Sequence, residues 1–258
     1  MALIRLDHVP ETVKVCHPLY MILPDPGKMG DVPLQDRKVL YLLHGLSDNG
    51  SAWGRYTSIE TIANDYGLVV VMPSIGRSFY ADLPNGQLYF TYLMEELPRY
   101  LKDVFCLDPK RENTLIAGNS MGGYGAFKAA LNYPERFSAA ASLSGVLSLQ
   151  ILQLMPDDQR QEEFKLIFGD LNKLGGTPHD PMVWLKKAAQ KPEGLPRLFV
   201  ACGKQDDLYP VNQMFYAASQ ELGVPIEYIE EDGYHDWYFW DKYIRWFLHE
   251  VLGEIPKD

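Results

Sequence analysis

Residues 114–127 read Thr114-Leu-Ile-Ala-Gly-Asn-Ser-Met-Gly-Gly-Tyr-Gly-Ala-Phe127 and contain the pentapeptide Gly118-Asn-Ser-Met-Gly122, which fits the pattern GxSxG. The pattern alone is weak evidence, and a glycine-rich turn can hold a serine by chance. Here, however, a strand-like apolar run precedes it and a segment with helical spacing follows it. A serine at such a junction lies on a sharp turn with its hydroxyl above the sheet. The context therefore predicts that Ser120 is a nucleophile.

The glycines after the serine support this interpretation. Gly122, Gly123 and Gly125 fall in the first turns of the predicted helix. Each glycine in a helix interior costs roughly 0.5–1 kcal/mol relative to alanine, so helix stability alone does not favour them. A requirement for close backbone contact around a catalytic serine accounts for them better.

A serine nucleophile needs a base, and in strand–GxSxG–helix hydrolases the base follows the acid in the chain. Three histidines follow Ser120, namely His179, His235 and His249. His179 stands beside a proline in a long irregular stretch, and His249 lies within the last predicted helix. His235 lies in the loop between the last predicted strand and that helix. We therefore expect His235 to be the base, the alternative being a histidine that caps the helix.

The acid should follow a strand that ends between the serine and the histidine. Residues 197–203 form such a strand, and the loop after it contains Asp206 and Asp207. Both aspartates are candidates at this point. The chosen carboxylate would hold the imidazole in the correct tautomer and stabilise the imidazolium that forms.

Acyl transfer also requires donors for the oxyanion. The backbone N–H of Met121, directly after the nucleophile, is one expected donor. The second is expected from the loop after the apolar run 39–43, where the N–H of Leu46 follows His44 and Gly45. We expect His44 to brace this loop rather than to act as a base.

Apolar runs alternate with helical spacing along most of the chain, which predicts a mostly parallel sheet with helices on both faces. Pro98 should bend or split one of the helices. A long mixed stretch at about 146–195 is interpreted as a cap-like insertion within a single domain, 1–258. The predicted strands are 39–43, 68–72, 114–117, 137–143, 198–202 and 226–229, and the predicted helices 59–66, 91–105, 121–131, 211–222 and 236–252.

Composition limits the possible functions. The 258 residues are 47% hydrophobic with a formal net charge of −10, which argues against nucleic acid and anionic membrane as partners. The chain start alternates apolar and polar residues like a first strand and lacks the features of a signal peptide. Three cysteines without a CxxC pair make a disulfide framework or a metal site improbable and favour a cytoplasmic location.

Four blocks of sequence, in order LLHGLSDN, GNSMGGYGAFKAA, CGKQDDLY and GYHDWYFWDKYI, resemble the esterase D family of α/β-hydrolases, which includes S-formylglutathione hydrolases. The segment Ser78–Asp82 is most similar to bacterial tributyrin-type carboxylesterases. The resemblance implies an α/β-hydrolase fold with a short cap, the triad Ser120, Asp206 and His235, and the oxyanion donors Leu46 and Met121. Asp206 is favoured because the family's acid is the third residue after the glycine that ends the strand.

The expected function is that of a serine carboxylesterase for short acyl esters, with a small-molecule ester as its partner and no metal or organic cofactor. Self-association into a homo-oligomer is left open. Alternatives are a thioesterase of the S-formylglutathione hydrolase type, an acetyl or feruloyl esterase on plant polysaccharide, and a catalytically dead binding module. Three aromatic residues are expected to line the substrate pocket: Tyr80, Trp184 and Trp237.

Overall fold

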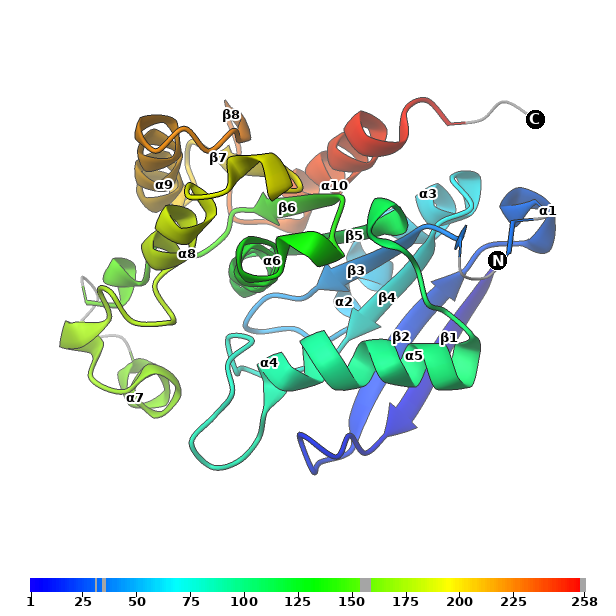
Figure 1. Ribbon diagram of the computed structural model, residues 1–258, viewed down its shortest axis with the longest axis horizontal. Helices are drawn as coiled ribbons and strands as arrows, with labels where there is room; N and C mark the ends of the chain where they lie inside the picture. The colour runs from blue at the N-terminus through cyan, green and yellow to red at the C-terminus, as the bar shows by residue number, and fades with distance from the viewer. Residues whose placement is uncertain (31, 34–35, 154–158, 256–258) are drawn as a thin grey trace.

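The structure is a computed structural model that describes every residue except 31, 34–35, 154–158 and 256–258. It contains one eight-stranded sheet in the order β1-β2-β4-β3-β5-β6-β7-β8 (Figure 1). The strands are β1 Ala2–His8, β2 His17–Leu23, β3 Val39–Leu43, β4 Val69–Pro73, β5 Thr114–Asn119, β6 Ala139–Leu143, β7 Arg197–Gly203 and β8 Glu227–Glu231.

Strands β3 to β8 run parallel, whereas β1 and β2 form an antiparallel hairpin that pairs antiparallel with β4. The central strands are apolar runs without alternation because both faces of a parallel sheet are covered. In β3, for example, all five residues are buried. The mostly parallel α/β-hydrolase sheet predicted from the sequence is thereby confirmed.

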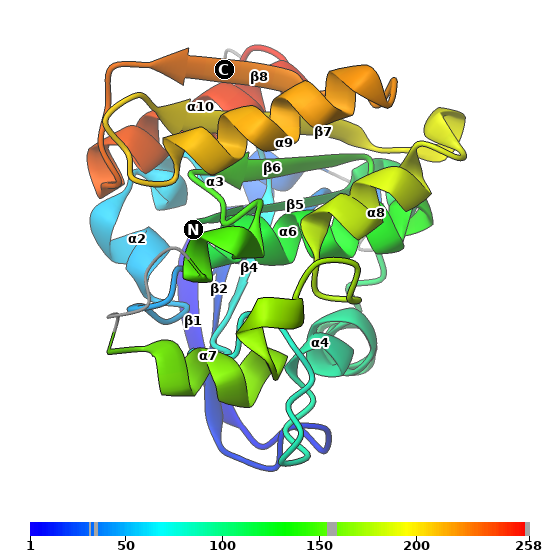
Figure 2. The ribbon, with the colours of Figure 1, turned by 90° about the vertical axis from the view of Figure 1, so that its left-hand side faces the viewer.

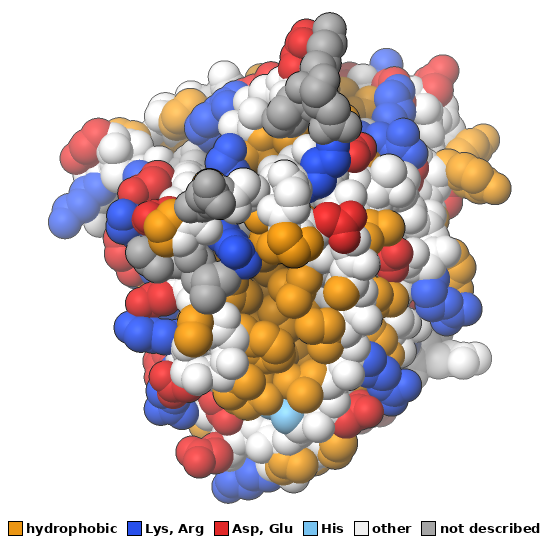
Figure 3. All heavy atoms as spheres, turned by 90° about the vertical axis from the view of Figure 1, so that its right-hand side faces the viewer, with side chains coloured by type: hydrophobic (Ala, Val, Ile, Leu, Met, Phe, Trp, Pro, Cys, Tyr) orange, Lys and Arg blue, Asp and Glu red, His pale blue; other side chains and the backbone are white. Residues whose placement is uncertain are grey.

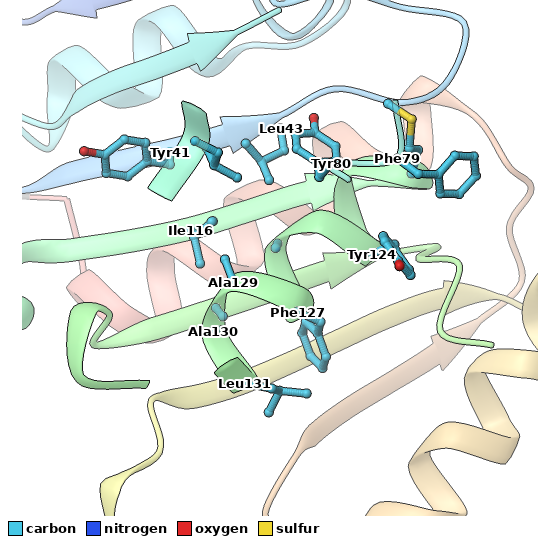
Figure 4. Close-up of a cluster of buried hydrophobic side chains, with 14 of the residues drawn as sticks. Tyr41, Leu43, Phe79, Tyr80, Ile116, Tyr124, Phe127, Ala129, Ala130 and Leu131 are labelled. Atoms are coloured by element: carbon cyan, nitrogen blue, oxygen red, sulfur yellow. The ribbon is translucent and has the colours of Figure 1, made fainter. Parts of the chain in front are cut away.

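Two apolar clusters, one on each face, hold the helices to the sheet. One contains side chains of α5 Leu97–Phe105, α6 Met121–Asn132, α8 Pro181–Ala188 and α9 Tyr209–Glu221. The other contains side chains of α2 Ala52–Tyr56, α3 Ile59–Asp65 and α10 Trp237–Leu252. Successive residues of β3 alternate between the clusters, with Leu42 in one and Leu43 in the other. Figure 4 shows part of the larger cluster, between α6 and the sheet.

The predicted helix at 91–105 is divided as follows: α4 Tyr89–Thr91, the π-helical turn η2 Tyr92–Glu96, and α5. Pro98 lies in the first turn of α5, where its missing N–H disrupts no bond within that helix. The ring nevertheless leaves the carbonyl of Met94, four residues earlier, without its helical donor. The guanidinium of Arg136 donates to that carbonyl instead. The segment thus stays helical through a π-turn rather than breaking.

The stretch between β6 and β7 contains two helices, α7 Gln161–Phe168 and α8, and residues 154–158 within it lie outside the described residues. Figure 2 shows α7 and α8 on the same side of the sheet as α6. Phe164 of α7 and Trp184 of α8 join the larger apolar cluster, so this segment packs onto the body of the molecule. Short helical turns complete the chain: α1 Pro26–Met29, η3 Arg111–Asn113, η4 Pro134–Arg136, η5 Leu149–Leu152, η6 Leu171–Lys173 and η7 Pro192–Gly194.

The sheet ends at β1 on one side and at β8 on the other. Figure 3 views the side of the molecule on which β1 and the end of α5 lie, and apolar side chains gather across the middle of that face. Leu3 of β1 and Val104 of α5 are both 54% exposed. None of the helices in the described ranges is long and apolar enough to cross a membrane.

Candidate active site

Four parallel strands end at one edge of the sheet, and the loops after them carry the predicted site residues. β3 leads to Leu46, β5 to Ser120, β7 to Asp206 and β8 to His235. In parallel α/β sheets, ligands bind outside the carboxyl ends of the strands, because the loops there converge. The topology therefore collects residues from Leu46 to His235, which lie 189 positions apart in sequence.

Ser120 occupies the turn between β5 and α6 with φ 53° and ψ −119°, a backbone conformation that costs a non-glycine residue strain. The glycines on both sides make this turn possible. A Cβ on Gly118 would lie 2.5 Å from the carbonyl of Gly122, and a Cβ on Gly122 would lie 2.3 Å from the carbonyl oxygen of Leu43. Backbone contact, as the sequence predicted, is what requires glycine here.

His235 and Asp206 form a hydrogen-bonded pair, with 2.8 Å between His235 Nδ1 and Asp206 Oδ2. The aspartate is 4% exposed, while the imidazole is partly open to solvent. The second oxygen of Asp206 accepts the N–H of Leu208 at 2.8 Å. Asp207, the other candidate, is an exposed residue. The structure thus places Asp206, and not Asp207, against the histidine.

The loops that hold these two residues are joined by their backbones. A Cβ on Gly203 would lie 2.2 Å from the carbonyl oxygen of Gly233, so the backbones of the two loops are in contact at this pair of glycines. Gln205 reinforces the contact: its N–H donates to the Gly233 carbonyl at 3.1 Å, and its Oε1 accepts the Gly233 N–H at 2.7 Å. This contact fixes the distance between the acid and the base.

Burial by itself raises the pKa of Asp206. The hydrogen bond and charge of His235, with the N–H of Leu208, outweigh this effect and leave the pKa below its usual value. Asp206 is therefore ionised at neutral pH and available to stabilise an imidazolium.

Ser120 and His235 line the same cleft, together with Asp206. The described residues include no hydrogen bond between Ser120 Oγ and the His235 ring. Catalytic hydrogen bonds of unliganded enzymes are often long and tighten when substrate binds. The arrangement therefore provides a nucleophile and a base–acid pair in one cleft, with the last contact still to form.

The loop after β3 approaches the nucleophile closely. A Cβ on Gly45 would lie 3.6 Å from the Cβ of Ser120. In the described part of the chain, the N–H of Leu46 has no hydrogen-bond acceptor. The N–H of Met121 begins helix α6 and has no acceptor within it. Both amides are thus available as the oxyanion donors that the sequence predicts.

His44 braces this loop rather than acting as a base. It is fully buried, and burial lowers its pKa to about 4, which keeps the ring neutral. Its Nε2 accepts the N–H of Ile75 at 3.1 Å. The proton must then reside on Nδ1, which lies 2.8 Å from the carbonyl oxygen of Gly45 and donates to it.

The cleft has a volume of about 510 Å³. Of the three aromatic residues predicted to line it, Trp237 does so, packed edge-on against Trp53 and Trp240. The structure places the other two elsewhere. Tyr80 is completely buried behind the cleft, and Trp184 is 1% exposed, its indole N–H donating to the carbonyl of Pro178 at 2.7 Å.

Other residues complete the cleft wall. Phe79, next to Tyr80 in the chain, lines the cleft, as do Ile151 and Phe164 of the insertion, and Arg160 is the one among them that sequence reasoning missed. A Ser-Phe-Tyr-Ala-Asp segment alone could not reveal which aromatic faces the cleft. Within the described ranges, no group of three or more histidine, cysteine or acidic side chains is arranged to hold a metal ion.

The parallel sheet, the strained serine between strand and helix, and the buried aspartate on a histidine define an α/β-hydrolase. The comparisons with known proteins agree. Residues 18–245 match the family described as putative esterases. An acetyl esterase of Caldicellulosiruptor saccharolyticus is 33% identical over 254 residues, which are 95% of this chain and 96% of the relative.

Two solved structures from Staphylococcus aureus show the same similarity. The fluorophosphonate-binding serine hydrolase FphF is 36% identical with a TM-score of 0.89, covering 98% of this chain and 99% of that one. The S-formylglutathione hydrolase FrmB is 36% identical with a TM-score of 0.86, covering 97% and 98%. The chain belongs to the putative esterase family, in its esterase D/S-formylglutathione hydrolase-like branch, and is a serine carboxylesterase.

Proposed function

We propose that the protein hydrolyses short-chain acyl esters with Ser120 as nucleophile, His235 as general base and acid, and Asp206 as the orienting carboxylate. The observation that carries this proposal is the 2.8 Å pair of His235 and Asp206 in the cleft that also contains the strained Ser120. The N–H groups of Leu46 and Met121 serve as the oxyanion donors.

The reaction proceeds in two halves. Ser120 Oγ attacks the acyl carbon while its proton passes to His235 Nε2, and the oxyanion accepts hydrogen bonds from the two amides. Collapse of this intermediate breaks the ester bond, and His235 returns the proton to the departing alcohol. Water then attacks the acyl-Ser120 ester by the same route, which releases the acid and restores the serine. Asp206 keeps the Nδ1 proton in place throughout.

Replacement of the nucleophile tests this mechanism. Ser120→Ala should lose nearly all hydrolysis of p-nitrophenyl acetate, with its thermal midpoint close to that of the unmodified protein. A fluorophosphonate probe should label the unmodified protein at Ser120 and leave the variant unlabelled. Hydrolysis by the alanine variant at the unmodified rate would overturn the assignment.

The cleft supports a preference for uncharged acyl esters. Its apolar wall includes Phe79, Val146, Ile151 and Phe164. Its acidic side chains, apart from Asp206, are Asp48, Asp207 and Asp236, opposed by the single cation Arg160 among the lining residues described. Carboxylates at the mouth of a cleft repel anionic substrates and favour neutral ones. The similarity to an acetyl esterase supports a small acyl group.

A thioester is the second candidate, because the FrmB structure described as an S-formylglutathione hydrolase is 36% identical over nearly the whole chain. Ester and thioester cleavage share every step of the mechanism above. The ratio of kcat/KM for S-formylglutathione to that for p-nitrophenyl butyrate separates them. A ratio far above one, together with loss of S-formylglutathione hydrolysis in Ser120→Ala, would show that the thioester is the preferred substrate.

We propose further that the protein forms a homo-oligomer in which two copies join through β1. This strand is a regular seven-residue edge, paired with β2 along its whole length. Antiparallel pairing of two β1 strands about Leu6 would set Arg5 of one copy opposite Asp7 of the other, a favourable cross-strand pair. The charge reversals Arg5→Asp and Asp7→Arg should each weaken association in light scattering, and the double variant should restore it.

We propose that the protein is cytoplasmic, which the three free cysteines support, Cys16 and Cys106 being exposed and Cys202 buried. We propose also that the chain is one domain in which residues 146–195 act as a cap. Ile151 and Phe164 at the cleft wall support that role.

A further inference from the structure

Tyr80 is a completely buried tyrosine beside the cleft that takes no part in the chemistry proposed above. Its hydroxyl donates to the carbonyl oxygen of His44 at 3.1 Å, and the bond is buried. Figure 4 shows Tyr80 directed toward the chain after β3, while Phe79 points another way. Tyr80 thus contacts the loop that carries the Leu46 amide, and Phe79 belongs to the cleft wall.

At the start of the loop after β3, the carbonyl oxygens of two successive residues, His44 and Gly45, both accept hydrogen bonds. Tyr80 holds the His44 carbonyl. The Gly45 carbonyl accepts from His44 Nδ1 at 2.8 Å and from the N–H of Asp48 at 3.2 Å. A peptide unit is planar with its C=O and N–H in opposite directions. Fixing the Gly45 carbonyl therefore directs the Leu46 N–H the other way.

Helix α6 is shaped to receive the tyrosine ring. A Cβ on Gly125 would lie 2.4, 2.6 and 3.0 Å from three carbons of that ring. The ring therefore rests directly on the backbone of the helix that begins after Ser120. One side chain thus spans the space between the nucleophile helix and the loop after β3.

The backbone at Tyr80 is strained and is tied down at the same place. Phe79 and Tyr80 have φ values of 52° and 48°, a region that non-glycine residues avoid. Lys128 of α6, which is 7% exposed, donates from Nζ to the Tyr80 carbonyl at 2.7 Å. A buried amine that donates to this strained carbonyl keeps the segment in its conformation, since backbone strain persists only where surrounding contacts impose it.

We propose that Tyr80 is a positioning residue for the oxyanion hole: its hydroxyl, braced through Gly125 and Lys128 on α6, holds the loop after β3 so that the Leu46 N–H lies at the proper distance from Ser120. The proposal rests on the triad and oxyanion donors assigned above. Because the tyrosine touches no reacting atom, its removal should weaken transition-state binding and leave ground-state binding nearly intact.

The test compares Tyr80, which packs against α6, with Tyr124, which lies in α6. The hydroxyl of each donates a hydrogen bond to a backbone carbonyl. Tyr80→Phe removes the bond to the His44 carbonyl. Tyr124→Phe is the matched control, because Tyr124 is also fully buried and donates to a backbone carbonyl, that of His179, at 2.9 Å. That carbonyl belongs to the insertion and not to the oxyanion loop. Active sites are counted by fluorophosphonate labelling, so rates refer to folded enzyme.

Loss of a whole oxyanion donor costs about 10²–10³ in kcat, and a misplaced donor should cost part of that. We expect kcat of Tyr80→Phe to fall about tenfold with KM within twofold, whereas Tyr124→Phe keeps its kcat. The affinity of Tyr80→Phe for an alkylboronic acid, which places an oxygen in the oxyanion hole, should fall by a factor similar to that in kcat. Gly125→Ala, which displaces the ring, should reproduce the effect.

The outcomes separate the two proposals. Persistence of fluorophosphonate labelling and of unmodified turnover in Ser120→Ala would refute the site itself. A Tyr80→Phe enzyme that labels normally, with kcat and boronate affinity within twofold of the unmodified protein, would refute only the role of Tyr80. A fall in thermal midpoint equal to that of Tyr124→Phe, without a kinetic change, would likewise reduce Tyr80 to a structural residue.

Discussion

Asp206→Asn is the most informative single substitution in the cleft, because the structure determines which way the new amide must turn. In the unmodified protein one carboxylate oxygen accepts the N–H of Leu208 and the other faces His235 Nδ1, each at 2.8 Å. Asparagine has only one acceptor oxygen. That oxygen is required by the Leu208 N–H, which donates to it in the unmodified protein, so the NH₂ group must face the imidazole.

The magnitude follows from this orientation. An NH₂ donor opposite Nδ1 turns that nitrogen into an acceptor and moves the ring proton of His235 to Nε2. A protonated Nε2 cannot take the proton of Ser120, and the negative charge that stabilises the imidazolium is lost as well. The same change in other triads lowers kcat about 10⁴-fold, equivalent to roughly 5–6 kcal/mol in the activation free energy. We expect a loss of that order here.

The assay is kcat on p-nitrophenyl butyrate at pH 7–8, with active sites counted by a slow fluorophosphonate. Asp207→Asn is the matched control, since it removes the same charge from an exposed side chain on the same loop. It should retain kcat within about threefold, as expected for a charge that solvent screens. Retention of a tenth or more of kcat by Asp206→Asn, or a larger loss in Asp207→Asn, would refute the reasoning.

Three further expectations concern stability and substrate binding. Burial lowers the pKa of Lys128 to about 7, so between pH 7 and 10 the unfolded chain binds a proton that the folded chain does not. The unfolding free energy should therefore rise with pH over this range, and Lys128→Met should reduce that slope by up to about 1.4 kcal/mol per pH unit. An unchanged slope in the variant would contradict the lowered pKa of Lys128. Arg136→Ala should lower the unfolding free energy in urea by about 1–3 kcal/mol, because it removes the donor to the buried Met94 carbonyl, and equal midpoints would contradict this. Trp237→Leu should raise KM for p-nitrophenyl esters several-fold with kcat little changed, and the reverse pattern would exclude Trp237 from substrate binding.

The sequence predicted the sheet and the positions of Ser120, His235 and the loop after β3 because these depend on local patterns. Buried parallel strands are short apolar runs, and the carboxyl ends of such strands meet at one edge whatever lies between them. Ser120 and His235 both follow such runs. The choice of Asp206 over Asp207 came only from the family resemblance, since two adjacent carboxylates on one loop look alike until the loop is folded against Gly233.

The rest depended on contacts that no local pattern contains. In a regular strand or helix, the direction of a side chain follows from its position in the period. Phe79 and Tyr80 lie outside any strand or helix, in consecutive positive-φ conformations, so no period gives the directions of their side chains. From the sequence, Tyr80 is therefore expected in the pocket, whereas its neighbour Phe79 lines the cleft. Similarly, Pro98 predicts a bend or a split in the helix, but the donor to the Met94 carbonyl is Arg136, which is remote in the chain.

Helix α6 shows how the site and the stability of the fold oppose each other. Gly122, Gly123 and Gly125 weaken it as an isolated helix, each by up to about 1 kcal/mol relative to alanine. Alanine would nevertheless bring a methyl group within 2.3–2.7 Å of Leu43, Ser142 or Tyr80. The helix forms because all residues from 121 to 131 are buried, so that tertiary packing replaces intrinsic propensity. Substitutions of Gly122 or Gly125 that improve the helix by its own propensity must therefore displace the backbone at the end of β3 or the tyrosine that holds the loop after it, and they should reduce turnover whatever they do to the helix.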